Sequence, residues 1–115
     1  MKKLENKVAI ITGAAAGLGK SIALLFAAEG SKVVAADINA AALNELKEEI
    51  AHAGGIVTTV VADMAKEEDI DMLFETALTA HGSVDNLVNN AGVMDQFDPV
   101  ADVDNNTWER VMAVN

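Results

Sequence analysis

A glycine-rich turn between an apolar strand and an apolar helix limits what this chain can fold into. Residues 7–30 read KVAIITGAAAGLGKSIALLFAAEG, with a short apolar run at 8–11 and apolar residues at helical spacing from 18 onwards. In a parallel sheet, such a turn directs free backbone N–H groups and the positive end of the helix dipole at one point, where a phosphate can bind. Glycines at 13, 17 and 19 allow the tight turn and the close approach of a ligand.

The spacing of these glycines leaves more than one motif open. It reads T-G-x-x-x-G-x-G and fails a strict search for G-x-G-x-x-G. The run Gly19-Lys20-Ser21 also resembles the end of the P-loop motif G-x-x-x-x-G-K-[ST], but that motif needs a glycine where this chain has Ala14. Dinucleotide binding is therefore the leading interpretation. A P-loop nucleotide triphosphatase is a distant alternative. A second alternative is a turn that only connects the strand to the helix and binds no ligand.

Length and composition indicate a single small domain and disfavour several classes of binding partner. The chain has 115 residues, 51% of them hydrophobic, which suffices for one small domain. Its net charge is −10 and its only basic run is Lys2-Lys3, which argues against nucleic acid as a partner. The absence of cysteine excludes disulfides and thiolate metal ligands, and we expect no metal site. No apolar run has transmembrane length and no signal peptide is recognisable, so we expect a cytoplasmic protein without a membrane partner.

Strand and helix patterns alternate along the chain. We expect strands over 7–12, 32–36, 56–62 and 84–88, and helices over 18–29, 40–53, 66–80 and from about 104 onwards. The apolar stripe of the first helix consists of Leu18, Ile22, Leu25 and Phe26. This order predicts an α/β fold with a doubly wound parallel sheet (a Rossmann fold), incomplete at about four strands and four helices. Its ligands should bind at the carboxyl ends of the strands.

Acidic and amide side chains stand at three of those strand ends. Asp37 follows the second strand, 18 residues after Gly19, where a carboxylate accepts hydrogen bonds from both hydroxyls of an adenosine ribose. The same charge would repel a 2′-phosphate, which favours NAD over NADP. Asp63 and Asn90 end the third and fourth strands. The histidines have structural positions instead, and His81 stands near a helix C-terminus, where a partly charged imidazole suits the helix dipole.

Over its whole length the chain resembles the short-chain dehydrogenase/reductase family. The resemblance is carried by Thr12-Gly13-x-x-x-Gly17-x-Gly19, Asp37, Asp63, Asn89-Asn90-Ala91-Gly92 and Asn115. It implies an NAD(P)-dependent oxidoreductase that acts on a small alcohol or ketone. It implies a pyrophosphate held by the backbone of Gly13, Gly17, Leu18 and Gly19, a ribose on Asp37, an adenine beside Asp63 and Met64, and Asn90 along the cofactor. Asn89 would brace the sheet, and Asn115 would be catalytic, in a proton relay with serine, tyrosine and lysine.

The main departure of the chain from the family is that it contains no tyrosine, and a smaller one is Ala65 before the third helix, where a Ser, Thr or Asp N-cap is usual. The family's catalytic serine and its Y-x-x-x-K motif would come after residue 115, and that tyrosine exchanges a proton with the substrate oxygen. We therefore expect residues 1–115 to be the N-terminal, cofactor-binding part of an oxidoreductase that is a homo-oligomer at full length, and to be inactive alone. A non-catalytic dinucleotide-binding module is the alternative. A bare apolar edge at the fourth strand further predicts that the isolated chain is marginally stable or oligomeric.

Overall fold

The computed structural model describes residues 4–90, in which strands and helices alternate. The strands are β1 (Val8–Thr12), β2 (Lys32–Asp37), β3 (Ile56–Val61) and β4 (Asn86–Val88), and the helices are α1 (Gly17–Ala28), α2 (Ala40–His52) and α3 (Glu67–His81). All seven elements predicted between residues 7 and 88 are confirmed, with ends that agree within two residues. The helix predicted from residue 104 lies outside the described residues.

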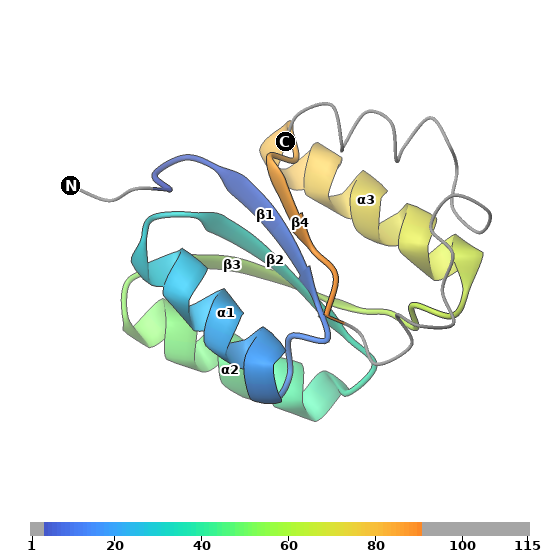
Figure 1. Cartoon of the computed structure of the whole chain (residues 1–115), viewed down its shortest axis with the longest axis horizontal. Coiled ribbons are helices and arrows are strands. Elements are labelled where there is room, and N and C mark those ends of the chain that lie inside the picture. The colour runs from blue at the N-terminus through green and yellow to red at the C-terminus, as the bar shows by residue number, and fades with distance from the viewer. Residues whose placement is uncertain (1–3, 91–115) are drawn as a thin grey trace.

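The four strands form one parallel sheet in the order β3-β2-β1-β4. Helices α1 and α2 cover one face and α3 covers the other, as Figure 1 shows. Thr12 pairs with Ala36, and Asp37 pairs with Val61, so the carboxyl ends of the strands come to one edge. The predicted doubly wound parallel sheet is confirmed, and every residue of the central strand β1 is buried.

Each face of the sheet has its own apolar core, because successive strand residues point to opposite faces. On the α3 face, Ile10 and Val34 pack with Leu73 and Phe74 of the helix. On the opposite face, alternate strand residues pack with the small residues of α1 and with the buried stripe of α2, which consists of Leu43, Leu46 and Ile50. The longest helix, α3, has 15 residues, and within residues 4–90 no helix has both the length and the apolar character to span a membrane.

Helix α1 buries its small residues rather than its large ones. Its buried side is Gly19, Ala23 and Ala27, spaced four residues apart on one face, and these small side chains let the helix lie close to the sheet. Leu18 and Leu25 are 66% and 59% exposed, so the apolar stripe predicted for this helix is wrong at these two positions. Because α1 is apolar nearly all round, hydrophobic spacing alone does not identify its buried face.

Candidate functional site

The turn between β1 and α1 lies at the carboxyl edge of the sheet. Gly13 and Gly17 have φ angles of 62° and 58°, in the left-handed region that residues with a Cβ rarely adopt. Between them, the Ala14 N–H donates to the Ala36 carbonyl oxygen at 3.1 Å, which fastens the turn to the end of β2. The glycines therefore set the conformation of this turn, as the sequence predicts.

Gly19 has a steric role instead of a conformational one. A Cβ at this position would overlap the Gly13 carbonyl oxygen and would lie 2.8 Å from Asn90 Nδ2. Gly13, Gly19 and Asn90, which the sequence assigns to one site, are thus brought into direct contact. The first turn of α1 packs against the loop that precedes it because Gly19 has no side chain.

Within residues 4–90, the N-terminus of α1 is the one that has neither a side-chain cap nor an acidic residue in its first turn. Its N-cap residue, Ala16, makes no side-chain hydrogen bond, and its first turn has no acidic residue. By contrast, Asn39 caps α2, and three acidic residues lie in the first turn of α3. Among residues 4–90, a Cβ on Gly17 would meet nothing within 4 Å, and Gly17 is exposed. The first N–H groups of a helix have no intrahelical acceptor, and an anion is suited to satisfy them.

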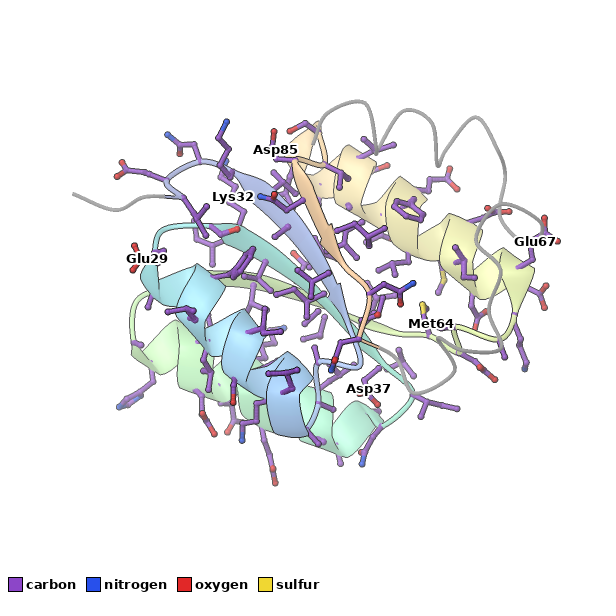
Figure 2. The ribbon with its side chains drawn as sticks, in the orientation of Figure 1. Glu29, Lys32, Asp37, Met64, Glu67 and Asp85 are labelled. Carbon is purple, nitrogen blue, oxygen red and sulfur yellow. The ribbon has the colours of Figure 1, made fainter. Side chains whose placement is uncertain are left out.

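Asp37 lies beside this helix terminus, at the end of β2. Its Oδ2 accepts a hydrogen bond from the Ala15 N–H at 3.0 Å, and its Oδ1 accepts one from the Asn39 N–H at 3.0 Å. The carboxylate therefore bridges the glycine-rich turn and the start of α2. An ionised carboxylate has about four acceptor positions, so each oxygen still has room for one further donor. In Figure 2, Asp37 and Met64 lie at one end of the sheet, and Lys32 and Asp85 lie at the other.

Thr12 makes two hydrogen bonds to the residues that follow β4, one to Asn89 and one to Asn90. Its Oγ1 donates to Asn89 Oδ1 at 2.9 Å and accepts from the Asn90 N–H at 2.9 Å. Asn89 therefore braces β1 against β4, as the resemblance implies. No separate role for Thr12 is expected from the sequence, although its position directly before Gly13 is a signal.

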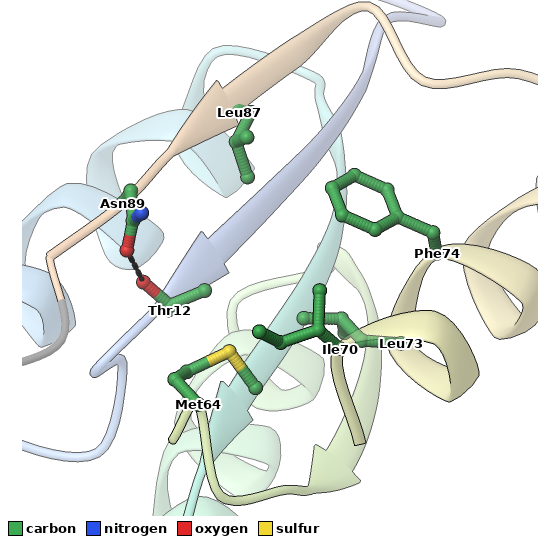
Figure 3. Close-up of a pocket in the computed structure, with 7 residues that line it drawn as sticks. All are labelled: Thr12, Met64, Ile70, Leu73, Phe74, Leu87 and Asn89. Carbon is green, nitrogen blue, oxygen red and sulfur yellow. Dashed lines mark hydrogen bonds between the residues drawn. The ribbon is translucent and has the colours of Figure 1, made fainter. Parts of the chain in front are cut away.

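Asp63 and Met64 follow β3 at the same edge. The Asp63 N–H donates to Asp69 Oδ2 at 2.8 Å, and Asp63 Oδ1 accepts from the Ala65 N–H at 2.9 Å. Met64 turns toward α3, where it lines a shallow hollow with Thr12 and Asn89, drawn in Figure 3. The other lining residues are apolar: Ile70, Leu73, Phe74 and Leu87. Asp69 is a contact of this site that the sequence analysis missed, because its link to Asp63 depends on how α3 begins.

Lys20 and His81, both considered from the sequence, have partners away from the glycine-rich turn. Lys20 Nζ lies 3.1 Å from a Glu49 carboxylate oxygen, so this side chain extends toward α2, which disfavours the P-loop alternative. At the last residue of α3, burial and then the charge of Lys32 lower the pKa of His81, which contradicts the predicted partly charged imidazole. His81 Nε2 lies 3.3 Å from Thr58 Oγ1. Within residues 4–90, no group of three or more His, Asp or Glu side chains is arranged to hold a metal ion.

The remaining predicted site residue, Asn115, lies outside the described residues, as do Ala91 and Gly92. All eight predicted cofactor-binding residues lie within residues 4–90, at or next to the carboxyl ends of the strands: Gly13, Gly17, Leu18, Gly19, Asp37, Asp63, Met64 and Asn90.

Comparison with known proteins relates this arrangement to dehydrogenases. A 3β-hydroxysteroid dehydrogenase 2 of Eggerthella lenta is 41% identical over 112 residues, which are 97% of this chain and 43% of the relative. The structure of a 7α-hydroxysteroid dehydrogenase complexed with NADH and 7-oxoglycochenodeoxycholic acid is 47% identical, with a TM-score of 0.76, over 77% of this chain and 35% of that one. A metagenomic short-chain oxidoreductase in complex with NADP is 32% identical, with a TM-score of 0.75, over 96% of this chain and 50% of that one.

The chain thus spans half or less of the length of these three proteins. Residues 7–115 also match the family described as short chain dehydrogenase, which is nearly the whole sequence. The glycine-rich turn, the strand-end aspartate and the parallel sheet order agree with that match. The chain belongs to the short-chain dehydrogenase family.

Proposed function

We propose that this chain is the NAD-binding part of an oxidoreductase that transfers a hydride between nicotinamide and the carbon of a small alcohol or ketone. The observation that carries the proposal is the uncapped N-terminus of α1 beside the Asp37 carboxylate, with no neighbour near Gly17 among residues 4–90. The positive end of a helix suits a pyrophosphate, and a carboxylate at the end of a neighbouring strand suits the adenosine ribose attached to it.

The pyrophosphate would lie on the backbone of the turn, at Gly13, Gly17, Leu18 and Gly19. The N–H groups at the start of α1 would donate to its oxygens, and the absence of a Cβ at Gly17 leaves room for them. No acidic side chain in the first turn of α1 opposes this charge. That local arrangement offsets the overall net charge of −10, which by itself repels a dinucleotide.

Asp37 would accept hydrogen bonds from the adenosine ribose and favour NAD over NADP. The hydrogen bonds from Ala15 and Asn39 hold its carboxylate in place and leave acceptor positions on both oxygens. A 2′-phosphate at that ribose would bring a second negative charge against a fixed carboxylate, which is unfavourable. Farther along the edge, Asp63 and the main chain of Met64 would contact the adenine, and Asn90 would lie along the cofactor toward the nicotinamide.

Catalysis would belong to the longer protein, in a proton relay that Asn115 joins. Bound nicotinamide supplies or accepts the hydride, and an acid–base group must exchange a proton with the substrate oxygen. These 115 residues contain no tyrosine for that task, so the chain alone would bind NAD without turnover. A non-catalytic dinucleotide-binding module is the second candidate. We further propose that the full-length protein is a cytoplasmic homo-oligomer, with no nucleic acid or membrane partner.

Binding measurements on the 115-residue chain test the proposal. Isothermal titration should give tighter binding of NADH than of NADPH, and Asp37→Ser should shift the ratio of the two dissociation constants toward NADPH by about tenfold or more. Glu45→Gln is the matched control, because Glu45 is an exposed acid on α2 away from the turn, and it should leave the ratio unchanged. Failure of the wild-type chain to bind either dinucleotide would overturn the proposal. A longer protein with a serine and a Tyr-x-x-x-Lys motif should oxidise an alcohol with NAD, which a non-catalytic module cannot do.

A further inference from the structure

We infer that Asp69, in the first turn of α3, is a positioning residue that holds Asp63 ready to recognise the amino group of adenine. The inference rests on the proposed NAD binding and adds to it a residue from a different element. The contact concerned is the hydrogen bond from the Asp63 N–H to Asp69, which is separate from the glycine-rich turn and from Asp37.

Asp63 is held by three hydrogen bonds to the segment that follows it. Its N–H donates to Asp69 Oδ2 at 2.8 Å, and its carbonyl oxygen accepts from the Lys66 N–H at 3.0 Å. Its Oδ1 accepts from the Ala65 N–H at 2.9 Å. Within residues 4–90, Asp63 Oδ2 makes no hydrogen bond that would satisfy it, so one carboxylate oxygen remains for an external donor.

Asp69 accepts the hydrogen bond from the Asp63 N–H at a helix start that has no side-chain N-cap. The N-cap residue Lys66 makes no side-chain capping bond, and Ala65 has no oxygen to offer. Glu67 and Glu68 are exposed, whereas Asp69 is half-buried and reaches back six residues to the backbone of Asp63. A carboxylate that accepts from a backbone N–H forms a charge-assisted hydrogen bond, which is shorter and stronger than a neutral one. The fixed end of β3 is therefore a consequence of Asp69.

The same strand end is tied to the ribose position. The Ala62 N–H donates to the Asp37 carbonyl oxygen at 3.0 Å, so Asp63 follows directly after a residue paired with Asp37. An ionised carboxylate only accepts hydrogen bonds, and it therefore selects a donor such as the exocyclic amine of adenine. Hypoxanthine presents a carbonyl oxygen in place of that amine, which a carboxylate disfavours. The pair Asp63 and Asp69 should thus discriminate between these two bases.

The test compares binding of NADH with that of reduced nicotinamide hypoxanthine dinucleotide to the 115-residue chain. The wild-type chain should bind NADH about tenfold more tightly. Asp69→Ala removes the acceptor for the Asp63 N–H and should reduce this preference to about twofold or less, whereas Asp69→Asn keeps an oxygen in place and should retain most of it. Asp71→Ala removes an exposed acid from the same helix and is the matched control, with the preference unchanged.

A change of fold and a change of recognition are distinguishable in this design. Circular dichroism checks that each variant is folded. If Asp69→Ala does not fold, Asp69→Glu keeps the charge but displaces the carboxylate by one methylene, and it should also lose the preference. Retention of the tenfold preference in the folded variants would refute the role of Asp69 and leave the proposed NAD binding intact. Equal binding of both dinucleotides by the wild-type chain would refute recognition by Asp63, and absence of NADH binding would overturn the proposed function together with this inference.

Discussion

Replacing Gly19 by alanine separates the steric role of this glycine from its effect on helix formation. In an exposed helix, glycine to alanine stabilises by about 1 kcal/mol, so helix propensity alone predicts a more stable protein. Here the new Cβ would overlap the Gly13 carbonyl oxygen and lie 2.8 Å from the Gly13 carbonyl carbon and from Asn90 Nδ2. Overpacking typically costs about 1–3 kcal/mol, and the upper end applies because two of these neighbours are backbone atoms that cannot rotate away.

The two effects leave a net destabilisation of about 2 kcal/mol, since the gain in propensity offsets part of the steric cost. For a domain of this size, that loss corresponds to a fall in Tm of about 8–16 °C. Thermal unfolding followed by circular dichroism measures it, and urea unfolding checks it through a lower midpoint at an unchanged m-value. Ser21→Ala, an exposed substitution two residues further along the same helix, should be neutral or slightly stabilising.

A Gly19→Ala variant as stable as the wild type would refute this reasoning, because it would mean that α1 does not pack against Gly13 and Asn90. The NADH affinity of the variant supplies a second readout. A forced movement of α1 away from the turn should weaken binding even at temperatures where the variant is fully folded. Ser21→Ala should bind NADH as the wild type does.

Three further predictions follow from the contacts of the described residues. Thr12→Val removes the hydroxyl that serves both Asn89 and the Asn90 N–H, so urea unfolding should show a loss of about 1–3 kcal/mol. Lys20→Met removes a partly exposed ion pair and should change stability by less than about 1 kcal/mol, with NADH binding retained; a loss of binding would revive the P-loop interpretation. The pKa of His81 is lowered in the folded state from 6.5, so its contribution to stability is complete above that pH and is lost as the pH falls from 6.5 through the folded-state value. Thermal unfolding between pH 5 and 8 should therefore show a fall in Tm on the acid side that His81→Gln reduces, and an equal fall in both proteins would contradict this assignment.

The features that the sequence predicts well are those that depend on local order. The strand, turn and helix around Gly13 and Gly17 are predicted from hydrophobic spacing and from the glycines. The place of Asp37 beside this turn is predicted from its position at the end of an apolar strand. The buried face of α2 is readable from the sequence as well, because Leu43, Leu46 and Ile50 are its only large apolar residues and recur at helical spacing. The carboxyl ends of parallel strands lie at one edge of the sheet, and this holds independently of how the side chains pack.

The features that the sequence does not predict depend on tertiary contact. Leu18 and Leu25 are exposed because the close packing of α1 on the sheet selects small residues, and an all-apolar helix gives no periodic signal for that choice. The reach of Asp69 to the Asp63 backbone depends on the path of the chain between β3 and α3. The lowered pKa of His81 depends on burial and on Lys32 from another strand, neither of which appears in the local sequence.

The two backbone hydrogen bonds of Asp37 have a consequence for redesign of cofactor preference. A substitution that admits a 2′-phosphate would also take the acceptor away from the Ala15 and Asn39 N–H groups, and so loosen both the turn and the start of α2. An unsatisfied N–H costs about 1–3 kcal/mol when it is buried, so a switch toward NADP would weaken the same scaffold that must hold the phosphates. Variants that supply a replacement acceptor, such as serine or asparagine, should therefore tolerate the switch better than alanine or arginine alone.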